Sequence, residues 1–74
     1  MGVRVYSTPA CVYCSMVKKY LELKNIKYDE IDVSIDSDAA AEMAEKSGQR
    51  SVPVIDFEGT MIIGFDKDKI DSML

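Results

Sequence analysis

The chain has no histidine, only two cysteines, and no apolar stretch longer than a few residues. Without histidine, a tetrahedral zinc site or an iron–sulfur site would find two thiols where roughly four ligands are needed. Two cysteines are also too few for a secreted scaffold held together by several disulfides. A membrane-spanning helix needs roughly 20 apolar residues. The sequence therefore predicts no metal centre held by this chain alone, and no association with membranes.

The charge is acidic and unevenly placed. Nine basic and thirteen acidic residues give a net charge of −4 at pH 7. Residues 1–28 hold five bases and one acid, and the alternative, functional interpretation of this asymmetry is that the first helix region stays open to anionic partners. Residues 29–45 hold seven acids and no base, a pattern typical of a solvated face. Because phosphate contacts need clustered Lys and Arg, no nucleic-acid partner is expected. No leader of charged and then apolar residues is evident, so the expected location is cytoplasmic.

Length and composition predict a single folded domain over residues 1–74. The hydrophobic share of 47% is ordinary for a folded protein. A domain of this size buries only about 60% of its unfolded surface, so each core side chain contributes heavily to stability. The chain has no room for a separate dinucleotide-binding domain, and no tightly bound cofactor is expected. Any chemistry must therefore be carried by few residues.

Hydrophobic periodicity predicts four strands and three helices. Segments that alternate or are rich in β-branched residues predict strands, and apolar residues at helical spacing predict helices. Asn25 and Gly48 are suited to end helices in the left-handed conformation, and Glu58-Gly59 fits a two-residue hairpin turn. The predicted strands are Gly2–Ser7, Tyr28–Val33, Pro53–Phe57 and Thr60–Ile63; the predicted helices are Val12–Lys24, one capped by Asp36 or Ser37 that runs through Lys46, and a short one that begins at Asp66.

This order of elements predicts an α/β fold with a mixed four-stranded sheet and helices on its faces. Two strands joined by a helix should be parallel with a right-handed crossover, and the closing hairpin should add antiparallel strands. The helical residues expected in the core include three methionines that fill gaps. These predicted core residues are Met16, Val17, Tyr20, Leu21, Leu23, Ala40, Met43, Ala44, Ile70, Met73 and Leu74.

The two cysteines lie where the first predicted strand gives way to the first helix, in Cys11-Val12-Tyr13-Cys14. A thiol at a helix N-terminus faces unpaired backbone N–H groups and the positive end of the helix dipole. Both favour the thiolate, so Cys11 is predicted to have a lowered pKa and to be the nucleophile. Because Ala10 has no side-chain acceptor, Cys11 is itself the candidate helix cap. Cys14, one turn later, can close a disulfide with Cys11 and is expected to be more buried.

Three alternatives compete with dithiol chemistry. A purely structural disulfide across so short a loop would contribute only about 2 kcal/mol on the entropic model. A metal or cluster site would need a dimer or borrowed thiols to complete its ligands. Two unconnected small apolar residues could also fall at this spacing by coincidence. Thiol–disulfide exchange is favoured because attack, mixed disulfide and resolution need only these two sulfurs.

A second motif, Gln49-Arg50-Ser51-Val52-Pro53, runs directly into a predicted strand. Proline is tolerated at the first residue of a strand because its missing N–H is not needed there. If the Val52–Pro53 bond is cis, the backbone N–H and C=O of Val52 turn outward, free to pair with an extended substrate. Alongside a helix-opening pair of cysteines, the sequence favours the cis form over an ordinary trans proline.

With these motifs, and with Gly64-Phe65-Asp66 ahead of the last helix, the chain resembles glutaredoxin-like proteins of the thioredoxin superfamily over essentially its full length. The resemblance implies the minimal thioredoxin (glutaredoxin) fold, dithiol–disulfide exchange, and glutathione as a co-substrate. It implies that Val52 pairs with the cysteinyl part of glutathione and that Gln49 or Arg50 faces the glycyl carboxylate. The further binding residues that the resemblance and the motifs indicate are Tyr13, Ser51, Pro53, Gly64, Phe65 and Asp66.

The chain also departs from the usual glutaredoxin pattern. Val12 replaces the usual proline, Thr8 stands where many relatives carry lysine, and Gly64-Phe65 replaces Gly-Gly. Val12 and Gly64-Phe65 resemble the glutaredoxin-like electron donors of ribonucleotide reductase, which thioredoxin reductase reduces. The sequence thus predicts a monomeric thiol–disulfide oxidoreductase acting on disulfide-containing client proteins, with Cys11 attacking and Cys14 resolving. Two alternatives stay open: a thioredoxin-reductase-dependent electron donor, and a dimer that bridges a [2Fe–2S] cluster through Cys11 and external thiols.

Overall fold

Four strands and three helices follow one another in the predicted order. The computed structural model describes residues 2–73. Leu74, which was expected on the inner face of the last helix, lies outside the described residues. The elements are β1 (Val3–Ser7), α1 (Val12–Leu23), β2 (Tyr28–Asp32), α2 (Ser37–Ser47), β3 (Val54–Phe57), β4 (Thr60–Ile63) and α3 (Lys67–Ser72).

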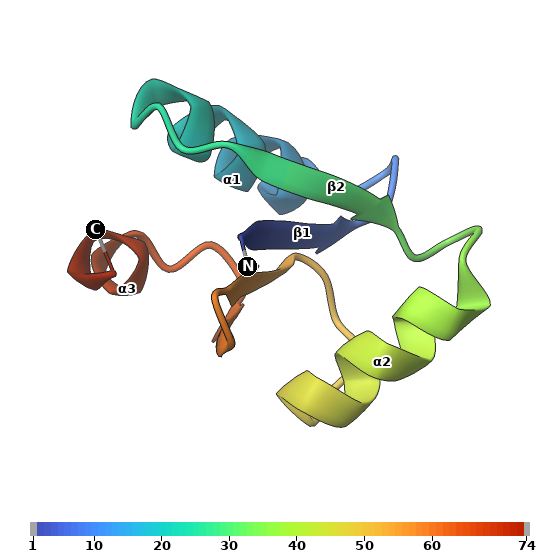
Figure 1. Ribbon diagram of the computed structural model, residues 1–74. Helices are drawn as coiled ribbons and strands as arrows, with labels where there is room; N and C mark the ends of the chain where they lie inside the picture. The colour runs from blue at the N-terminus through green and yellow to red at the C-terminus, as the bar shows by residue number, and fades with distance from the viewer. Residues whose placement is uncertain (1, 74) are drawn as a thin grey trace.

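The strands form one mixed sheet in the order β2-β1-β3-β4 (Figure 1). β1 and β2 are parallel, and β3 is antiparallel to both β1 and β4, as the sequence predicted. The β3–β4 hairpin turns through Glu58 and Gly59, which both have positive φ, 51° and 99°. Positive φ at both turn residues matches the right-handed twist of the two strands, which is why such turns make tight hairpins. The predicted fold class is confirmed.

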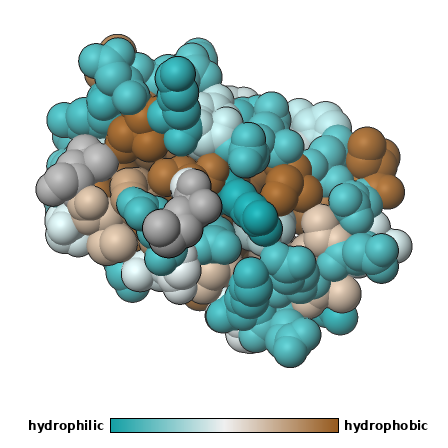
Figure 2. All heavy atoms as spheres, viewed as in Figure 1, coloured by the Kyte–Doolittle hydropathy of each residue, from teal (hydrophilic) through white to brown (hydrophobic). Residues whose placement is uncertain are grey.

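Helices cover both faces of this sheet. Because strand side chains alternate, Val5 and Ile55 point to the face covered by α1 and α3, whereas Tyr6 and Val54 point to α2. The face covered by α1 holds the larger core cluster. On the other face, Met43 of α2 packs with Tyr6 and Val54. The region of α2, at the lower right of Figure 2, is predominantly hydrophilic, as expected for the acidic segment.

Capping residues fix the helix ends where the sequence placed them. The carboxylate of Asp36 accepts the Ala39 N–H at 3.0 Å and caps α2. Asp66 caps α3 in the same way, accepting the Lys69 N–H at 3.1 Å. α2 ends at left-handed Gly48, with φ of 77°. These caps satisfy backbone groups that a helix end leaves unpaired.

Two residues predicted in the core lie on the surface instead. Met16 is 40% exposed and Leu23 is 80% exposed, whereas the buried side of α1 is the narrow stripe of Cys14, Val17 and Leu21. A helix that packs one side on a sheet buries only residues three or four apart, and Met16 and Leu23 lie on the side of the helix turned away from that stripe. Strand β3 begins at Val54, one residue later than predicted. Pro53 has no N–H to donate to a strand ladder.

A polar contact joins the two helices on the larger core. The Tyr20 hydroxyl donates a hydrogen bond to the Asp71 carboxylate of α3, and the Tyr20 ring meets Phe65 edge to face at 5.8 Å between centroids. The hydrogen bond to Asp71 is the main cause that raises the pKa of Tyr20 to about 12. The pKa of Tyr28 is also raised to about 12, mainly by burial and secondly by a hydrogen bond to Glu22.

Asp71→Asn is therefore expected to lower the pKa of Tyr20 towards 10.0 and to leave that of Tyr28 near 12. The interactions that raise the folded-state pKa of Tyr20 stabilise the fold fully below pH 10.0, the ordinary pKa of the group. Their contribution is lost as the pH rises through about 12. Phenolate absorbance during an alkaline titration measures both groups in one experiment. If the variant titrates as the wild type does, Asp71 does not control Tyr20.

Candidate redox site

Cys11 caps the first helix. A turn after β1 is closed by the Cys11 N–H, which donates to the Thr8 carbonyl at 3.3 Å. Cys11 keeps an extended backbone, and its Sγ accepts the N–H of Cys14 at 3.0 Å. The sulfur thus takes the place that a Ser or Asp oxygen usually occupies at a helix start. The prediction that Cys11 acts as the cap is confirmed.

The two sulfurs differ in access. They are joined in a disulfide whose Cα atoms are 5.2 Å apart, within the ordinary range. Cys14 is 1% exposed, whereas Cys11 is only partly buried. Val12 and Tyr13 between them are 74% and 60% exposed and place apolar surface beside the Cys11 sulfur. A partner molecule can therefore reach Cys11 but not Cys14.

Two distant segments converge beside the cysteines. The Val52–Pro53 peptide bond is cis, as the sequence favoured. The Pro53 carbonyl accepts the N–H of Gly64 at 2.8 Å. This hydrogen bond joins residues 49–53, the proline loop, to the turn ahead of α3. A shallow groove of about 350 Å³ is lined by five of the residues that the sequence indicated for binding, Tyr13, Val52, Pro53, Gly64 and Phe65.

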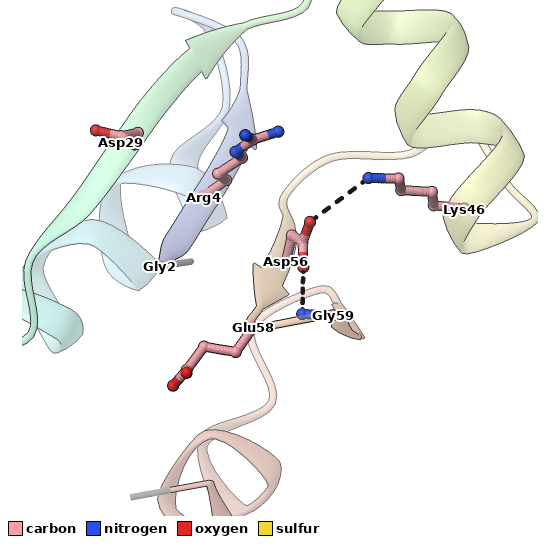
Figure 3. Close-up of a pocket in the computed structure, with 7 residues that line it drawn as sticks. All are labelled: Gly2, Arg4, Asp29, Lys46, Asp56, Glu58 and Gly59. Carbon is pink, nitrogen blue, oxygen red and sulfur yellow. Dashed lines mark hydrogen bonds and ion pairs between the residues drawn. The ribbon is translucent and has the colours of Figure 1, made fainter.

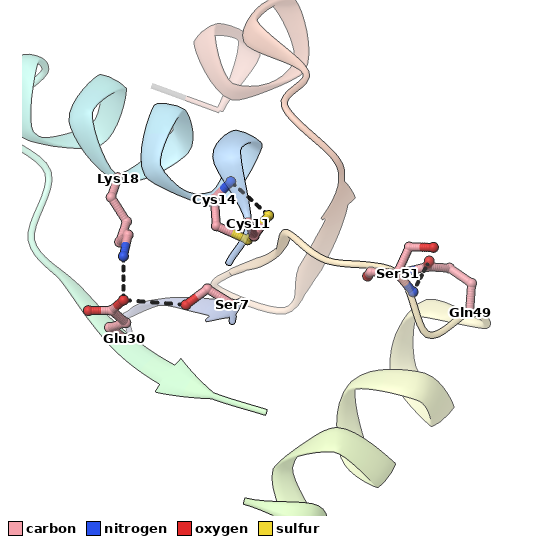
Figure 4. The surroundings of a disulfide bond; sticks show 7 residues. All are labelled: Ser7, Cys11, Cys14, Lys18, Glu30, Gln49 and Ser51. Carbon is pink, nitrogen blue, oxygen red and sulfur yellow. Dashed lines mark hydrogen bonds and ion pairs between the residues drawn. A yellow bond between two sulfur atoms is a disulfide. The ribbon is translucent and has the colours of Figure 1, made fainter. Parts of the chain in front are cut away.

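The other four indicated residues do not line this groove. The Gln49 amide accepts the Ser51 N–H at 2.6 Å and donates to the Ser51 carbonyl at 3.1 Å, so it braces its own loop (Figure 4). Asp66 is occupied as the α3 cap. Arg50 and Ser51 are exposed. A role for these four residues in binding a ligand stays a prediction.

Sequence reasoning missed a polar network beneath the first turns of α1. The Ser7 hydroxyl donates to Glu30 Oε2 at 3.3 Å, and Lys18 Nζ donates to the same oxygen at 2.5 Å. Ser7 is only 2% exposed. Strand alternation could have placed Ser7 and Glu30 on one face, but their pairing depends on the register between β1 and β2. These three side chains form the Ser7–Glu30–Lys18 network.

A second hollow, of about 400 Å³, lies at the opposite end of the sheet, where β1 and β2 begin (Figure 3). Its basic side chains are engaged in ion pairs: Arg4 lies 3.6 Å from Glu42, and Lys46 lies 3.0 Å from Glu42. Asp56 lies 3.8 Å from Lys46 and accepts the Gly59 N–H at 2.9 Å. Asp56 thus connects Lys46 of α2 with the hairpin turn at this hollow.

Residues 2–73 contain neither a metal-binding cluster nor a membrane-spanning helix. No group of three or more His, Cys, Asp or Glu side chains there is placed to hold a metal ion. None of the helices described is long and apolar enough to cross a membrane.

An accessible helix-capping cysteine, a buried partner one turn later, and this sheet order together define a thiol–disulfide redox protein with the thioredoxin fold. Residues 3–62 match the family model for glutaredoxin. The chain belongs to the glutaredoxin family. It is 40% identical over 72 residues to an uncharacterized glutaredoxin-like 8.6 kDa protein in the rubredoxin operon of Clostridium pasteurianum, covering 97% of this chain and 96% of that protein.

Solved structures share the fold over nearly the whole chain. The thioredoxin-like protein BC3987 has a TM-score of 0.91 at 30% identity, covering 97% of this chain and 99% of that one. The glutaredoxin-like NrdH-redoxin of Escherichia coli, described as having a thioredoxin-like activity profile, has a TM-score of 0.87 at 27% identity, with 100% and 96% covered. A buckwheat glutaredoxin in complex with glutathione has a TM-score of 0.80 at 33% identity, with 99% and 72% covered.

Proposed function

We propose that this protein is a thiol–disulfide oxidoreductase that reduces protein disulfides or glutathione mixed disulfides through Cys11 and Cys14. The observation that carries the proposal is the unequal access of two sulfurs that already lie within bonding reach of each other. The accessible Cys11 sulfur, facing the Cys14 N–H, attacks the substrate disulfide as a thiolate. The buried Cys14 then attacks Cys11, which releases the reduced substrate.

Glutathione is the co-substrate that the groove beside Cys11 fits in part. Val52, Pro53 and Gly64 line it, and a similar buckwheat glutaredoxin forms a complex with glutathione. An extended tripeptide could pair with the Val52 backbone, as strands pair at a sheet edge. The polar atoms of Gln49 and Asp66, however, are already used within the chain.

A second candidate is an electron donor that thioredoxin reductase reduces, of the kind that serves ribonucleotide reductase. Its support is the similarity to NrdH-redoxin over 96% of that chain, and the apolar Val12 and Phe65 beside the cysteines. Apolar surface of this kind suits a protein surface better than a charged tripeptide. Because the dithiol must be re-reduced after each cycle, we place the protein, as a monomer, in the reducing cytoplasm.

Coupled assays test the proposal and separate the reductants. Wild-type protein with NADPH, glutathione and glutathione reductase is expected to reduce a glutathione mixed disulfide. With NADPH and thioredoxin reductase in their place, it is expected to reduce insulin if it is the electron donor. NADPH oxidation measures both, and each reductase without the protein is the blank. Turnover above the blank in neither assay would overturn the proposed function.

A further inference from the structure

The resolving step needs a proton to leave a buried sulfur. A thiol becomes a nucleophile only when it loses its proton, and burial favours the neutral form. Cys14 is 1% exposed, so bulk water has little access to its sulfur. The chain has no histidine, the residue that most often moves protons near neutral pH. Another group must therefore accept the Cys14 proton.

The Ser7–Glu30–Lys18 network lies on the correct side of the sheet for this task. Strand alternation puts Ser7 on the same face as Val3 and Val5, the face on which the buried side of α1 packs. Lys18 lies one helical turn after Cys14, at the spacing that makes residues neighbours on a helix surface. In Figure 4 Ser7 lies between the disulfide and Glu30.

We propose that Glu30, acting through the Ser7 hydroxyl, accepts the proton of Cys14 during the resolving step, while Lys18 holds the Glu30 carboxylate in place. This inference rests on the dithiol exchange proposed above. The Ser7 hydroxyl directs its own proton to Glu30, so its oxygen keeps lone pairs that can accept a thiol proton. Glu30 and Lys18 are positioning residues, because neither carboxylate nor ammonium touches the reacting sulfurs.

The proposed step balances in protons and electrons. In the mixed disulfide between Cys11 and the substrate, the Cys14 proton passes to the Ser7 oxygen as the Ser7 proton passes to Glu30. The Cys14 sulfur bonds to the Cys11 sulfur, and the bond between Cys11 and the substrate sulfur breaks. The substrate leaves as a thiolate and takes a proton from water. The dithiol has lost two electrons to the substrate, and the half-exposed Glu30 returns its proton to solvent.

Few other ionisable groups face this region. On the α1 side near Cys14, α1 contributes Lys18, its cap is Cys11, and β2 contributes Glu30 and Asp32. The proline loop contributes Val52 and Pro53, which are apolar. Asp32 accepts the backbone N–H of Ser34 at 2.9 Å, which directs its carboxylate to the loop after β2. Glu30 is therefore the carboxylate placed to serve Cys14.

Rapid mixing of the reduced protein with one equivalent of 5,5′-dithiobis(2-nitrobenzoate) separates the two sulfurs. Cys11 releases the first nitrothiobenzoate in its attack, and Cys14 releases the second when it resolves the mixed disulfide. Glu30→Gln is expected to slow the second release at least about tenfold near pH 7, a modest effect for a proton acceptor. The first release should be unchanged. At high pH the difference should vanish, because hydroxide then removes the Cys14 proton directly.

Two further variants make the result specific. Ser7→Ala, which removes the hydroxyl but no charge, should slow the second release as Glu30→Gln does. Asp29→Asn makes the same charge change on the neighbouring residue of β2, whose side chain points to the opposite face, and should alter neither release. A second release of normal rate in Glu30→Gln, or a slowing that is equal in both phases or independent of pH, would overturn the proposal. Because the probe is a small disulfide, two normal releases without turnover in the coupled assays would overturn the proposed function alone.

Discussion

Cys11→Ser is expected to reduce turnover in the coupled assays to the rate of the blank. The Cys11 sulfur is the one that a substrate can reach, and it accepts the Cys14 N–H at 3.0 Å at the helix start. Serine keeps the cap, because its oxygen can accept the same N–H, but a hydroxyl stays protonated and is a poor nucleophile at neutral pH. The variant should therefore fold but should not attack the substrate disulfide. NADPH oxidation with either reductase measures the loss.

Cys14→Ser is the matched control, because it makes the same chemical change one helical turn away. The variant should still exchange with a glutathione mixed disulfide, since that reaction can proceed through Cys11 and a second glutathione molecule. It should fail to release protein substrates and should accumulate as a mixed disulfide with them, visible by non-reducing electrophoresis. Activity of Cys11→Ser close to that of the wild type, or equal loss in both variants with glutathione, would contradict the assignment of the two roles.

The cysteine pair could be placed from the sequence because its geometry is local. A helix that begins at Val12 fixes Cys11 as its cap and puts Cys14 one turn away, whatever the rest of the fold does. The caps at Asp36 and Asp66 were predictable for the same reason. Placing the proline loop from the sequence required knowledge of the sheet as well, because its position beside the cysteines depends on the antiparallel pairing of β1 with β3.

Features that depend on register or on loop conformation could not be predicted. The Gln49 amide hydrogen-bonds with the Ser51 backbone within its own loop, a contact that depends on the conformation of that loop. The contact of Ser7 with Glu30 requires β1 and β2 to align with Ser7 opposite Asp32, and a shift of one residue would turn Glu30 to the other face. Neither arrangement leaves a signal in the residue types alone.

Helical periodicity also left open which residues of α1 are buried. Leu21 and Leu23 are both apolar and lie two residues apart, and the sequence predicted both to be in the core. In the structure Leu21 is completely buried among the α1-side core residues, whereas Leu23 is 80% exposed. Helix positions two apart point in nearly opposite directions, so only one of the two can face a sheet. Replacing each of these two leucines by alanine therefore makes the same chemical change once at a buried position and once at an exposed one.

Leu21→Ala is expected to lower the free energy of unfolding by about 2–5 kcal/mol, through lost transfer energy and the cavity left behind. At about 0.05–0.15 kcal/mol per residue, a domain this small has a total stability of about 4–11 kcal/mol, so the variant would lose a large part of it. Leu23→Ala should change stability by less than about 0.5 kcal/mol, because its side chain already meets water. Urea denaturation of the oxidised proteins measures both, with the disulfide intact in every sample. Equal destabilisation by the two substitutions would contradict the packing of α1 on the sheet, and with it the position of Cys14 on the buried side of that helix.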